Sequence, residues 1–359
     1  HTIEEHGFKA YAVGGCIRDS ILGRNPDDWD ITTSAVPSQI KTFFKRTVDT
    51  GIAHGTVTIM IDKTGYEVTT YRIDGEYEDG RHPKSVEFSD RLVDDLCRRD
   101  FTINAMAYND TDGFVDEFKG LDDLDTKIIR CVGEPELRFT EDALRMMRAI
   151  RFSAQLGFTI DEATWNAIKK LSPSISKISM ERVHVELGKT LMSAHPDYVA
   201  QYSEAGLFAP ILPVIDNALK SRYKRKILAT LQHTPDNIYL RYAALFITST
   251  PDEAAKTLRA LKLDNKTVNT VSKLVELSKM DIEETEPAVR TALNKYGRDF
   301  LPLWHELMMA VIQASEDITG ISNPAKVKHL LTLKRLGTDI LARGDCFTIK
   351  DLDISGNDL

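Results

Sequence analysis

The sequence predicts an α+β protein in which a mixed β-sheet is followed by a region made of helices alone. Over residues 1–134, short apolar runs with β-branched residues alternate with turns marked by Gly and Pro. After about Glu134, apolar residues recur instead at the spacing of amphipathic helices. The chain of 359 residues is long enough for about two domains with a substantial buried core.

Composition excludes several classes of protein. Hydrophobic residues make up 42% and charged residues 28%, which is typical of a globular chain and not of a disordered or fibrous one. No apolar stretch approaches the roughly 18 residues that a membrane span needs, and no signal-peptide core begins the chain. The four cysteines form no C-x-x-C pair, so neither a zinc knuckle nor a disulfide framework is predicted. We therefore expect a cytoplasmic protein.

The net charge of −8 is unevenly distributed. Residues 1–134 carry 16 Lys and Arg against 26 Asp and Glu, a net of −10, which leaves +2 for residues 135–359. An acidic first part argues against nonspecific coating of nucleic acid through bulk charge, and it suits a segment that holds divalent cations. A partner that carries phosphates would need local basic sites.

The first elements form a strand–helix–strand unit. Residues 8–15 are an apolar run that ends in a Gly pair. Residues 16–23 have helical spacing closed by a glycine, and residues 29–34 are again extended.

A helix and a hairpin come next. Pro37, at a first helical position, favours a helix over residues 37–46. Residues 55–62 and 66–72 alternate β-branched with polar residues around a turn, which predicts an antiparallel hairpin. From Asp74 to Pro83 the charge is high and periodicity is absent, so we expect a mobile loop.

The rest of the chain predicts helices. Residues 136–158 have one long helical pattern with Leu, Met, Ile and Phe on one side. Pro and Gly punctuation then divides the chain into helical hairpins, near residues 194–197, 205–213, 234–237 and 249–251. The chain begins without Met and ends in a turn that would lead into a further element, so we expect a fragment.

The first candidate site is a pair of acids beside a pair of glycines. Asp28 and Asp30 are two residues apart on a predicted strand, so their carboxylates share a face and can bind one hard cation. Gly14 and Gly15 precede a helix N-terminus, where backbone N–H groups can approach a phosphate, and Arg18 lies one turn on. An isolated Asp-x-Asp pair is more typical of solvated carboxylates. The Gly pair and Arg18 favour a metal and phosphate site.

Two further stretches add polar candidates. Glu67 is a third acid if its strand lies beside that of Asp28, although an exposed strand Glu is common. Asp100 can cap a helix while Arg99 reaches a ribose or a phosphate, and a capping Asp with solvated arginines fits the spacing equally well. Asn104 is polar within an apolar run, so we expect it to be hydrogen-bonded.

A last stretch spaces Asp142, Arg145, Arg148 and Arg151 at steps of three. Each step drifts by about 60° around a helix, so Asp142 and Arg145 are neighbours and Arg151 faces the far side. An Asp acceptor beside an Arg donor can read the edge of a nucleobase. A surface ion pair with solvated arginines is the alternative.

Together these motifs resemble the class II tRNA nucleotidyltransferases of the polymerase-beta superfamily, which include CCA-adding enzymes and bacterial poly(A) polymerases. The resemblance rests on G-G-x-x-R-D, D-x-D, E-V-T-T-Y-R, R-R-D-F-T-I-N-A and E-D-x-x-R in the family's order, over about residues 9–190. It implies an N-terminal nucleotidyltransferase head with a mixed sheet, then an all-α neck, a body and a partial tail that binds RNA. These parts would be residues 1–134, 135–200, 201–310 and 311–359.

The resemblance implies catalysis at Asp28, Asp30 and Glu67. The two aspartates would bind two Mg²⁺ ions that activate an RNA 3′ hydroxyl and neutralise a triphosphate, and Glu67 would support them. The implied substrates are CTP and ATP, the implied partner is tRNA, and no nucleic-acid template is needed if the protein itself reads the base. Residues 220–226 and 326–335 are candidate RNA contacts, with a solvated helix face as the alternative.

Nucleotide binding is implied for the other motif residues, which would hold the triphosphate, the ribose region and the base edge in turn. They are Gly14, Gly15 and Arg18; Arg99 and Asp100; and Asp142 with Arg145, while Arg148 and Arg151 would lie nearer phosphate than base.

Several activities fit this pattern. Within the family, the alternatives to CCA addition are addition of A alone, addition of CC, and poly(A) synthesis. Relatives limited to CC addition have a shortened loop at residues 74–86, and this chain retains that loop, which favours a capacity for A addition. From another class, a noncatalytic RNA-binding protein would have the same fold, but the intact Asp28 and Asp30 argue against it.

Overall fold

A computed structural model describes residues 1–75 and 85–344 of the chain, which form two compact units. The first unit comprises residues 1–178 and holds the sheet, and the second begins at Ser179 and is helical. None of the helices in the described part has the length and apolarity needed to cross a membrane.

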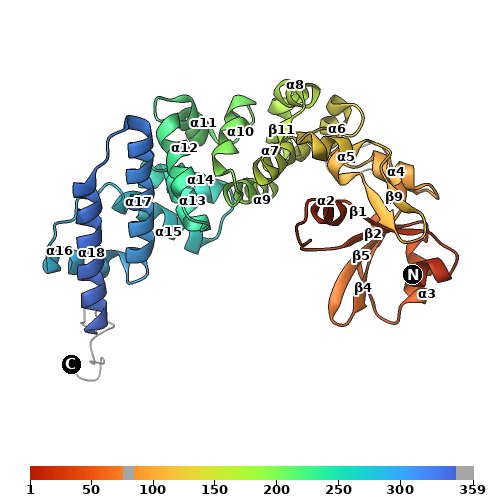
Figure 1. Ribbon diagram of the computed structural model, residues 1–359, viewed down its shortest axis with the longest axis horizontal. Helices are drawn as coiled ribbons and strands as arrows, with labels where there is room; N and C mark the ends of the chain where they lie inside the picture. Colours follow the sequence, from red (N-terminus) through yellow and green to blue (C-terminus); the bar gives the residue numbers. More distant parts are fainter. Residues whose placement is uncertain (76–84, 345–359) are drawn as a thin grey trace. The chain divides into compact units, whose positions relative to one another are not determined.

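The sheet of the first unit has seven strands in the order β3-β4-β5-β2-β1-β8-β9 (Figure 1). Strands β2 and β5 pair in parallel, and the other neighbours are antiparallel, so the predicted mixed sheet is confirmed. The strands are β1 Ala10–Val13, β2 Asp30–Thr33, β3 Thr47–Gly51, β4 Thr56–Ile61, β5 Thr64–Thr70, β8 Ala107–Asn109 and β9 Gly113–Val115.

The predicted strand–helix–strand unit and hairpin are both present. Helix α2 (Gly15–Ile21) connects β1 to β2, and β4 pairs with β5 through a turn in which Asp62 and Lys63 adopt positive φ. Sequence analysis did not predict β3, β8 or β9. The last two are only three residues long, which is too short for an alternating pattern to stand out.

Strand side chains alternate between two covered faces of this sheet. On one face, Val57 and Val68 pack against Ile40 of helix α3 (Pro37–Phe43), with the short helix α1 (Thr2–Glu5) nearby. On the other face, Tyr11 and Val13 pack against Leu96 of helix α4 (Leu92–Cys97). The register places Asp30 and Glu67 on this second face, because Thr32 pairs with Tyr11 and Asp30 pairs with Glu67.

Short elements complete the first unit. Strands β6 (Arg72–Asp74) and β7 (Val86–Phe88) form an antiparallel ribbon, so Asp74 belongs to a strand, while residues 76–84 of the predicted loop lie outside the described residues. The other short elements are the 3₁₀ turns η1 Ile52–His54, η2 Thr102–Asn104 and η3 Ser172–Lys177, helix α5 Gly120–Asp125, and the parallel pair β10 Ile128–Ile129 and β11 Thr159–Ile160.

The prediction of one long helix over residues 136–158 is wrong, because the structure has two helices there. Helix α6 (Pro135–Glu141) ends at Asp142, whose backbone is extended at φ −145° and ψ 105°, and helix α7 (Leu144–Leu156) begins two residues later. The Asp142 Oδ1 accepts a hydrogen bond from the Leu144 N–H at 3.0 Å. Such a local side-chain bond competes with helical pairing and favours an interruption. Helix α8 (Glu162–Leu171) follows.

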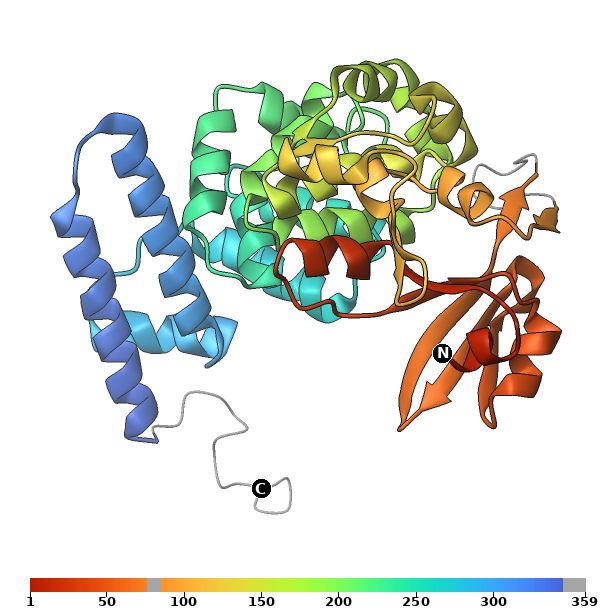
Figure 2. The same cartoon turned by 45° about the vertical axis from the view of Figure 1, so that its right-hand side comes forward.

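The second unit contains a series of helices with the predicted punctuation. Helix α12 ends at His233 and α13 begins at Ile238, where Asn237 caps it, and α14 begins at Pro251 after a Thr250 cap. In Figures 1 and 2, the last two helices lie side by side in blue. The elements are α9 Met180–Leu191, η4 Pro196–Val199, α10 Ala200–Glu204, α11 Pro213–Lys220, α12 Lys224–His233, α13 Ile238–Leu245, α14 Pro251–Ala260, α15 Asn265–Leu277, α16 Glu286–Tyr296, α17 Phe300–Thr319 and α18 Pro324–Ala342.

The four-part division into head, neck, body and tail stays a prediction. Its first boundary, at residues 134 and 135, coincides with the start of α6, whereas its last, at residues 310 and 311, falls within α17.

Candidate active site

Three acids meet at one end of the paired strands β2 and β5. Asp30 is the first residue of β2 and lies directly opposite Glu67 of β5. Asp28 lies two residues before β2 and is exposed, so the prediction that both aspartates belong to the strand is wrong for Asp28. Burial raises the pKa of Asp30, and the charges of Asp28 and Glu67 raise it further while Arg99 opposes them. The three carboxylates therefore act on one another, as sequence analysis expected if the two strands were neighbours.

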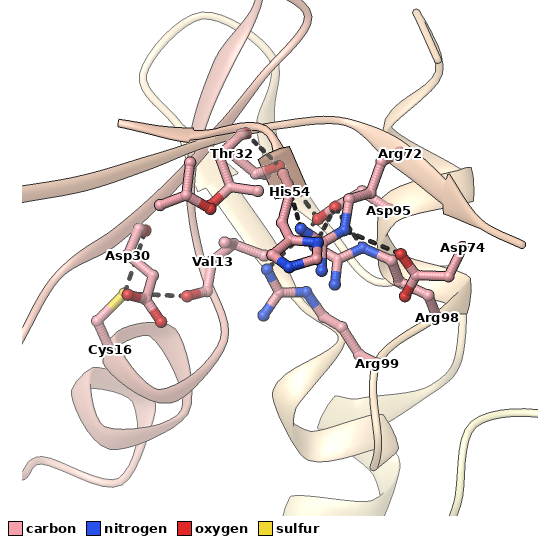
Figure 3. Close-up of polar contacts among 12 residues, drawn as sticks. Val13, Cys16, Asp30, Thr32, His54, Arg72, Asp74, Asp95, Arg98 and Arg99 are labelled. Atoms are coloured by element: carbon pink, nitrogen blue, oxygen red, sulfur yellow. Dashed lines mark hydrogen bonds and ion pairs between the residues drawn. The ribbon is translucent and has the colours of Figure 1, made fainter. Parts of the chain in front are cut away.

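Gly14, between β1 and α2, allows the main chain to lie close to the Arg99 side chain. It precedes α2 with φ 84° and ψ −130°, and a Cβ at this position would lie 2.8 Å from the Arg99 Nη1. Only glycine adopts this backbone without strain and leaves room for the guanidinium. The Arg99 Nε is buried and has no hydrogen-bond partner within residues 1–75 and 85–344. In Figure 3 the Arg99 guanidinium lies between Asp30 and the side chain of Asp95.

Asp95 anchors both arginines of the Arg98–Arg99 pair. It is fully buried in α4, and it accepts hydrogen bonds from Arg98 Nε and Nη2 at 2.9 and 2.6 Å and from Thr32 at 3.1 Å. Its ion pair with Arg99 measures 3.4 Å. Burial alone would raise the pKa of Asp95, but the two arginines hold it below its ordinary value. Sequence analysis missed Asp95, although its spacing of three and four residues from the arginines was a usable signal.

One continuous chain of hydrogen bonds runs from Arg18 through Asn104 and Asp100 to Arg148. Arg18 Nη1 donates to Asn104 Oδ1 at 2.7 Å, and Asn104 Nδ2 donates to Asp100 Oδ1 at 3.1 Å. Arg148 Nε donates to Asp100 Oδ2 at 2.7 Å, and Asp19 pairs with Arg18 at 2.7 Å. The hydrogen-bonding role expected for Asn104 is confirmed, and the partner Asp19 was not predicted.

Asp100 does not cap a helix, so the capping role predicted for it is wrong. Its Oδ1 accepts from the Phe101 N–H at 2.9 Å, but the following 3₁₀ turn has no side-chain cap. Burial favours the neutral carboxyl, yet Arg148 and Asn104 outweigh it and lower the pKa of Asp100 to about 2. The carboxylate therefore stays charged and holds Arg148 in place.

Arg145 connects α7 to two earlier segments of the main chain through hydrogen bonds. Its Nη1 donates to the Arg138 carbonyl oxygen at 3.1 Å and pairs with the Glu141 carboxylate, and its Nη2 donates to the Arg98 carbonyl oxygen at 3.1 Å. Asp142 stands at the junction of α6 and α7, and not on a helix with Arg145 as the spacing predicted. Sequence analysis did not predict the role of Glu141, although its spacing of four residues from Arg145 was a usable signal.

Arg151 and Arg148 share a neighbour that the spacing did not predict. The guanidinium carbons of Arg148 and Arg151 lie 5.4 and 3.9 Å from the centroid of the Phe152 ring. Arg151 is buried, with its Nη1 donating to Gln155 at 2.8 Å. Arg151 was expected on the far side of the helix from Asp142 and Arg145, which stays a prediction, and its side chain lies over the ring of the next residue.

Gly14→Ala should destabilise the first unit and displace Arg99. The strained backbone and the contact with Nη1 together cost about 1–3 kcal/mol of unfolding free energy. Urea denaturation measures this loss. Gly23→Ala is a matched control, because Gly23 also has a positive φ of 69° but nothing lies within 4 Å of its Cβ position. Equal losses for the two variants would contradict the close approach of Arg99.

Asp100→Asn should remove a pH-dependent part of the stability. The pKa of Asp100 falls from 3.8 to about 2 on folding, so the folded state favours the carboxylate, and the stabilisation is complete above about pH 4. It is worth about 2 kcal/mol and disappears as the pH falls from about 4 to 2. Urea denaturation from pH 7 to 3 should show the gap between wild type and variant narrowing below pH 4. The exposed Asp122→Asn should show no such change, and a gap that stays constant down to pH 3 would contradict the role of Arg148.

Comparisons with known proteins agree with this geometry. The model of the poly A polymerase head domain matches residues 10–130, and that of the probable RNA and SrmB-binding site of polymerase A matches residues 157–219. The CCA-adding enzyme of Limosilactobacillus reuteri is 50% identical over 221 residues, which are 60% of this chain and 54% of that protein. The chain thus spans about half the length of that curated relative.

Two longer matches cover most of the chain. The CCA-adding enzyme of Streptococcus suis is 39% identical over 340 residues, which are 92% of this chain and 81% of that protein. The structure of the Bacillus stearothermophilus CCA-adding enzyme in complex with CTP has a TM-score of 0.76 and 32% identity, and the match covers 99% of this chain and 84% of that one. A Thermotoga maritima CCA-adding enzyme complexed with tRNA shares the fold, with a TM-score of 0.60 and 20% identity. The motifs, the mixed sheet and these matches agree, and the chain belongs to the family of CCA-adding enzymes.

Proposed function

We propose that the chain is a template-independent tRNA nucleotidyltransferase that adds CCA to the tRNA 3′ end from CTP and ATP and releases pyrophosphate. The observation that carries this proposal is the pairing of Asp30 with Glu67 on adjacent strands, beside Asp28 and facing Arg99. Acids and arginines in one site are what metal-assisted phosphoryl transfer needs. The relatives named as CCA-adding enzymes, one of them solved with CTP, support the choice of reaction. The cytoplasmic location is part of the same proposal.

The residues present fit a Mg²⁺ site at Asp28 and Asp30. Their carboxylate oxygens, with Glu67 in support, are hard ligands. Burial first and then the charges of Asp28 and Glu67 raise the pKa of Asp30, and a bound cation would relieve the repulsion among these acids. Within residues 1–75 and 85–344, no three or more His, Cys, Asp and Glu side chains form a ready metal cage. Mg²⁺ is typically held by one or two carboxylates together with substrate phosphates, so an incomplete site agrees with this ion. When bound, it would supply Lewis-acid activation of the 3′ hydroxyl.

The chain's own groups then position the nucleotide. Gly14 and Gly15 bring the main chain close to the triphosphate, and Arg99 beside Gly14 and Arg18 beside Gly15 supply cationic donors. Binding through several fixed guanidinium groups lowers the entropy lost when the reacting atoms are aligned.

The motif residues that follow Arg99 would contact the sugar and the base. Asp142 and Arg145 supply an acceptor and a donor for the edge of C or A, and no template is needed. Asp100 takes the ribose region. Arg148 and Arg151 stand nearer phosphate, and their shared contact with Phe152 agrees with a common ligand group.

The tRNA would contact the helical second unit. Two basic segments predicted for RNA contact each contribute a lysine, Lys226 of α12 and Lys326 of α18, to one groove of about 570 Å³. These two lysines can contact an RNA backbone, while the other lining residues of the groove are mostly apolar. Other lysines of the first segment are paired with carboxylates, Lys220 with Asp216 and Lys224 with Glu204.

Product sequencing tests the proposed function and its alternatives. The protein would be incubated with tRNA that lacks its 3′ end and with CTP, ATP or both. We expect two C residues with CTP alone and complete CCA with both nucleotides. Products that end in CC or in A alone, or that carry long A tracts, would point to the alternative family activities. No incorporation with any metal would favour a noncatalytic RNA-binding protein. The loop that would favour A addition lies largely in residues 76–84, outside the described residues.

Asp28→Ala and Asp30→Ala should each abolish nucleotide addition, because each removes a metal ligand. Neither should lower the unfolding temperature much, because Asp28 is exposed and Asp30 is only half-buried. Incorporation of labelled CTP measures activity, and thermal unfolding measures stability. Asp125→Ala, an exposed aspartate of α5, should retain full activity. Wild-type turnover in either site variant would refute the metal assignment.

Asp142→Ala should reduce discrimination against UTP and GTP more than it reduces triphosphate binding. It also removes the hydrogen bond from the Leu144 N–H, which costs about 1 kcal/mol. Competition assays with all four nucleotides measure selection. Asp264→Ala is the matched control, because it removes a comparable bond between an aspartate and a backbone N–H at the start of α15, where Asp264 accepts from Thr267 at 2.9 Å. An unchanged preference for CTP and ATP in Asp142→Ala would place selection elsewhere.

A further inference from the structure

Three arginine side chains gather around a single aromatic ring in the first unit. The guanidinium carbons of Arg18, Arg148 and Arg151 lie 5.0, 5.4 and 3.9 Å from the centroid of the Phe152 ring. Arg18 comes from α2, whereas the other two come from α7. Like charges at this separation repel one another, so the arrangement persists only because other groups hold it.

The ring is fixed by its surroundings and offers its face to the cations. Phe152 is only 5% exposed, and the fully buried Phe101 packs edge-on against it, with centroids 5.7 Å apart and an interplanar angle of 80°. The face of an aromatic ring is the negative end of its quadrupole, and it attracts cations within about 6 Å. The attraction is strongest at a largely desolvated site such as this one. Phe152 is therefore the contact that the three arginines share.

A hydrogen-bonded chain couples two of these arginines across the elements that carry them. The chain from Arg18 through Asn104 and Asp100 to Arg148 joins α2 to α7 without using the ring. These hydrogen bonds fix one edge of the Arg18 and Arg148 guanidinium groups, and the Phe152 ring fixes the planes of the two groups. A guanidinium whose edge and plane are both fixed presents its remaining N–H groups in one direction, which is the condition for tight binding of a phosphate chain.

We propose that Phe152 is a positioning residue for the polyphosphate of the nucleotide, setting the spacing of Arg18, Arg148 and Arg151 through its ring face. This inference rests on the proposed function in so far as it takes a nucleoside triphosphate as the natural ligand. Phe152 touches neither base nor reacting atoms and acts only through the arginines. A leucine of similar bulk would fill the space and leave the hydrogen bonds of Arg18 and Arg148 in place, but it has no ring face to set the planes of the guanidinium groups.

Binding of inorganic tripolyphosphate tests the proposal without base, ribose or tRNA. Calorimetric titration of the full chain should show about tenfold weaker binding for Phe152→Leu than for wild type. Phe158→Leu is the matched control and should bind as wild type does, since Phe158 is also 5% exposed but none of the arginines in the described part of the chain lies over its ring. Phe152→Tyr, which keeps the ring, should restore binding to within about threefold of wild type.

Steady-state kinetics separate positioning from a general loss of structure. Phe152→Leu should raise the KM for CTP and for ATP by about tenfold while kcat stays within about twofold, because the ring organises the ground-state triphosphate site. A purely structural role would lower kcat through a smaller folded fraction, and Phe158→Leu would show the same effect.

Each outcome decides the inference. Tripolyphosphate binding by Phe152→Leu as tight as by Phe158→Leu would overturn it, and so would a wild-type protein that does not bind tripolyphosphate. If Phe152→Leu does not fold, Phe152→Met, whose flexible side chain fills the same space, is judged by the same comparison. If the wild type adds no C or A to tRNA but its tripolyphosphate binding depends on Phe152, the inference stands while the proposed function fails.

Discussion

The parallel pairing of β2 with β5 is the constraint on which the candidate site depends. It sets Asp30 directly opposite Glu67 on the face of the sheet that α4 covers, and no rotation of side chains can separate them far. Two acids at paired positions destabilise the sheet unless a cation balances them. Arg99 balances part of this negative charge, and a divalent ion would balance the rest. The repulsion between the acids, which disfavours folding, is therefore what makes the site bind a cation.

Buried aspartates, and not exposed ones, place the arginines of the site. Asp95 holds Arg98 and Arg99, and Asp100 holds Arg148. Removing a carboxylate from water costs several kcal/mol, and this cost is offset only when the geometry of the ion pair is excellent. The lowered pKa values of both carboxyls indicate that the offset is achieved here. The arginines therefore meet their ligand with their positions already fixed.

Sequence patterns predicted the elements better than the junctions between them. The hairpin, the mixed sheet and the bonded state of Asn104 all follow from alternation or from a polar residue in an apolar run. The break at Asp142 could not be predicted, because a hydrogen bond from one side chain to a nearby N–H outweighs a favourable apolar stripe. The contact of Arg151 with Phe152 could not be predicted either, because a helical wheel gives the direction of Cβ and not that of a long flexible side chain.

The bonds of Arg145 have an evolutionary consequence. Two of its acceptors are main-chain carbonyl oxygens, at positions 98 and 138, and carbonyl groups are supplied by every residue type. Relatives can therefore exchange the side chains at those two positions without moving the Arg145 guanidinium. Lysine at position 145 could not form both hydrogen bonds, since its single ammonium group cannot reach two acceptors in fixed directions. A change of side chain at position 98 or 138 is thus compatible with arginine at position 145.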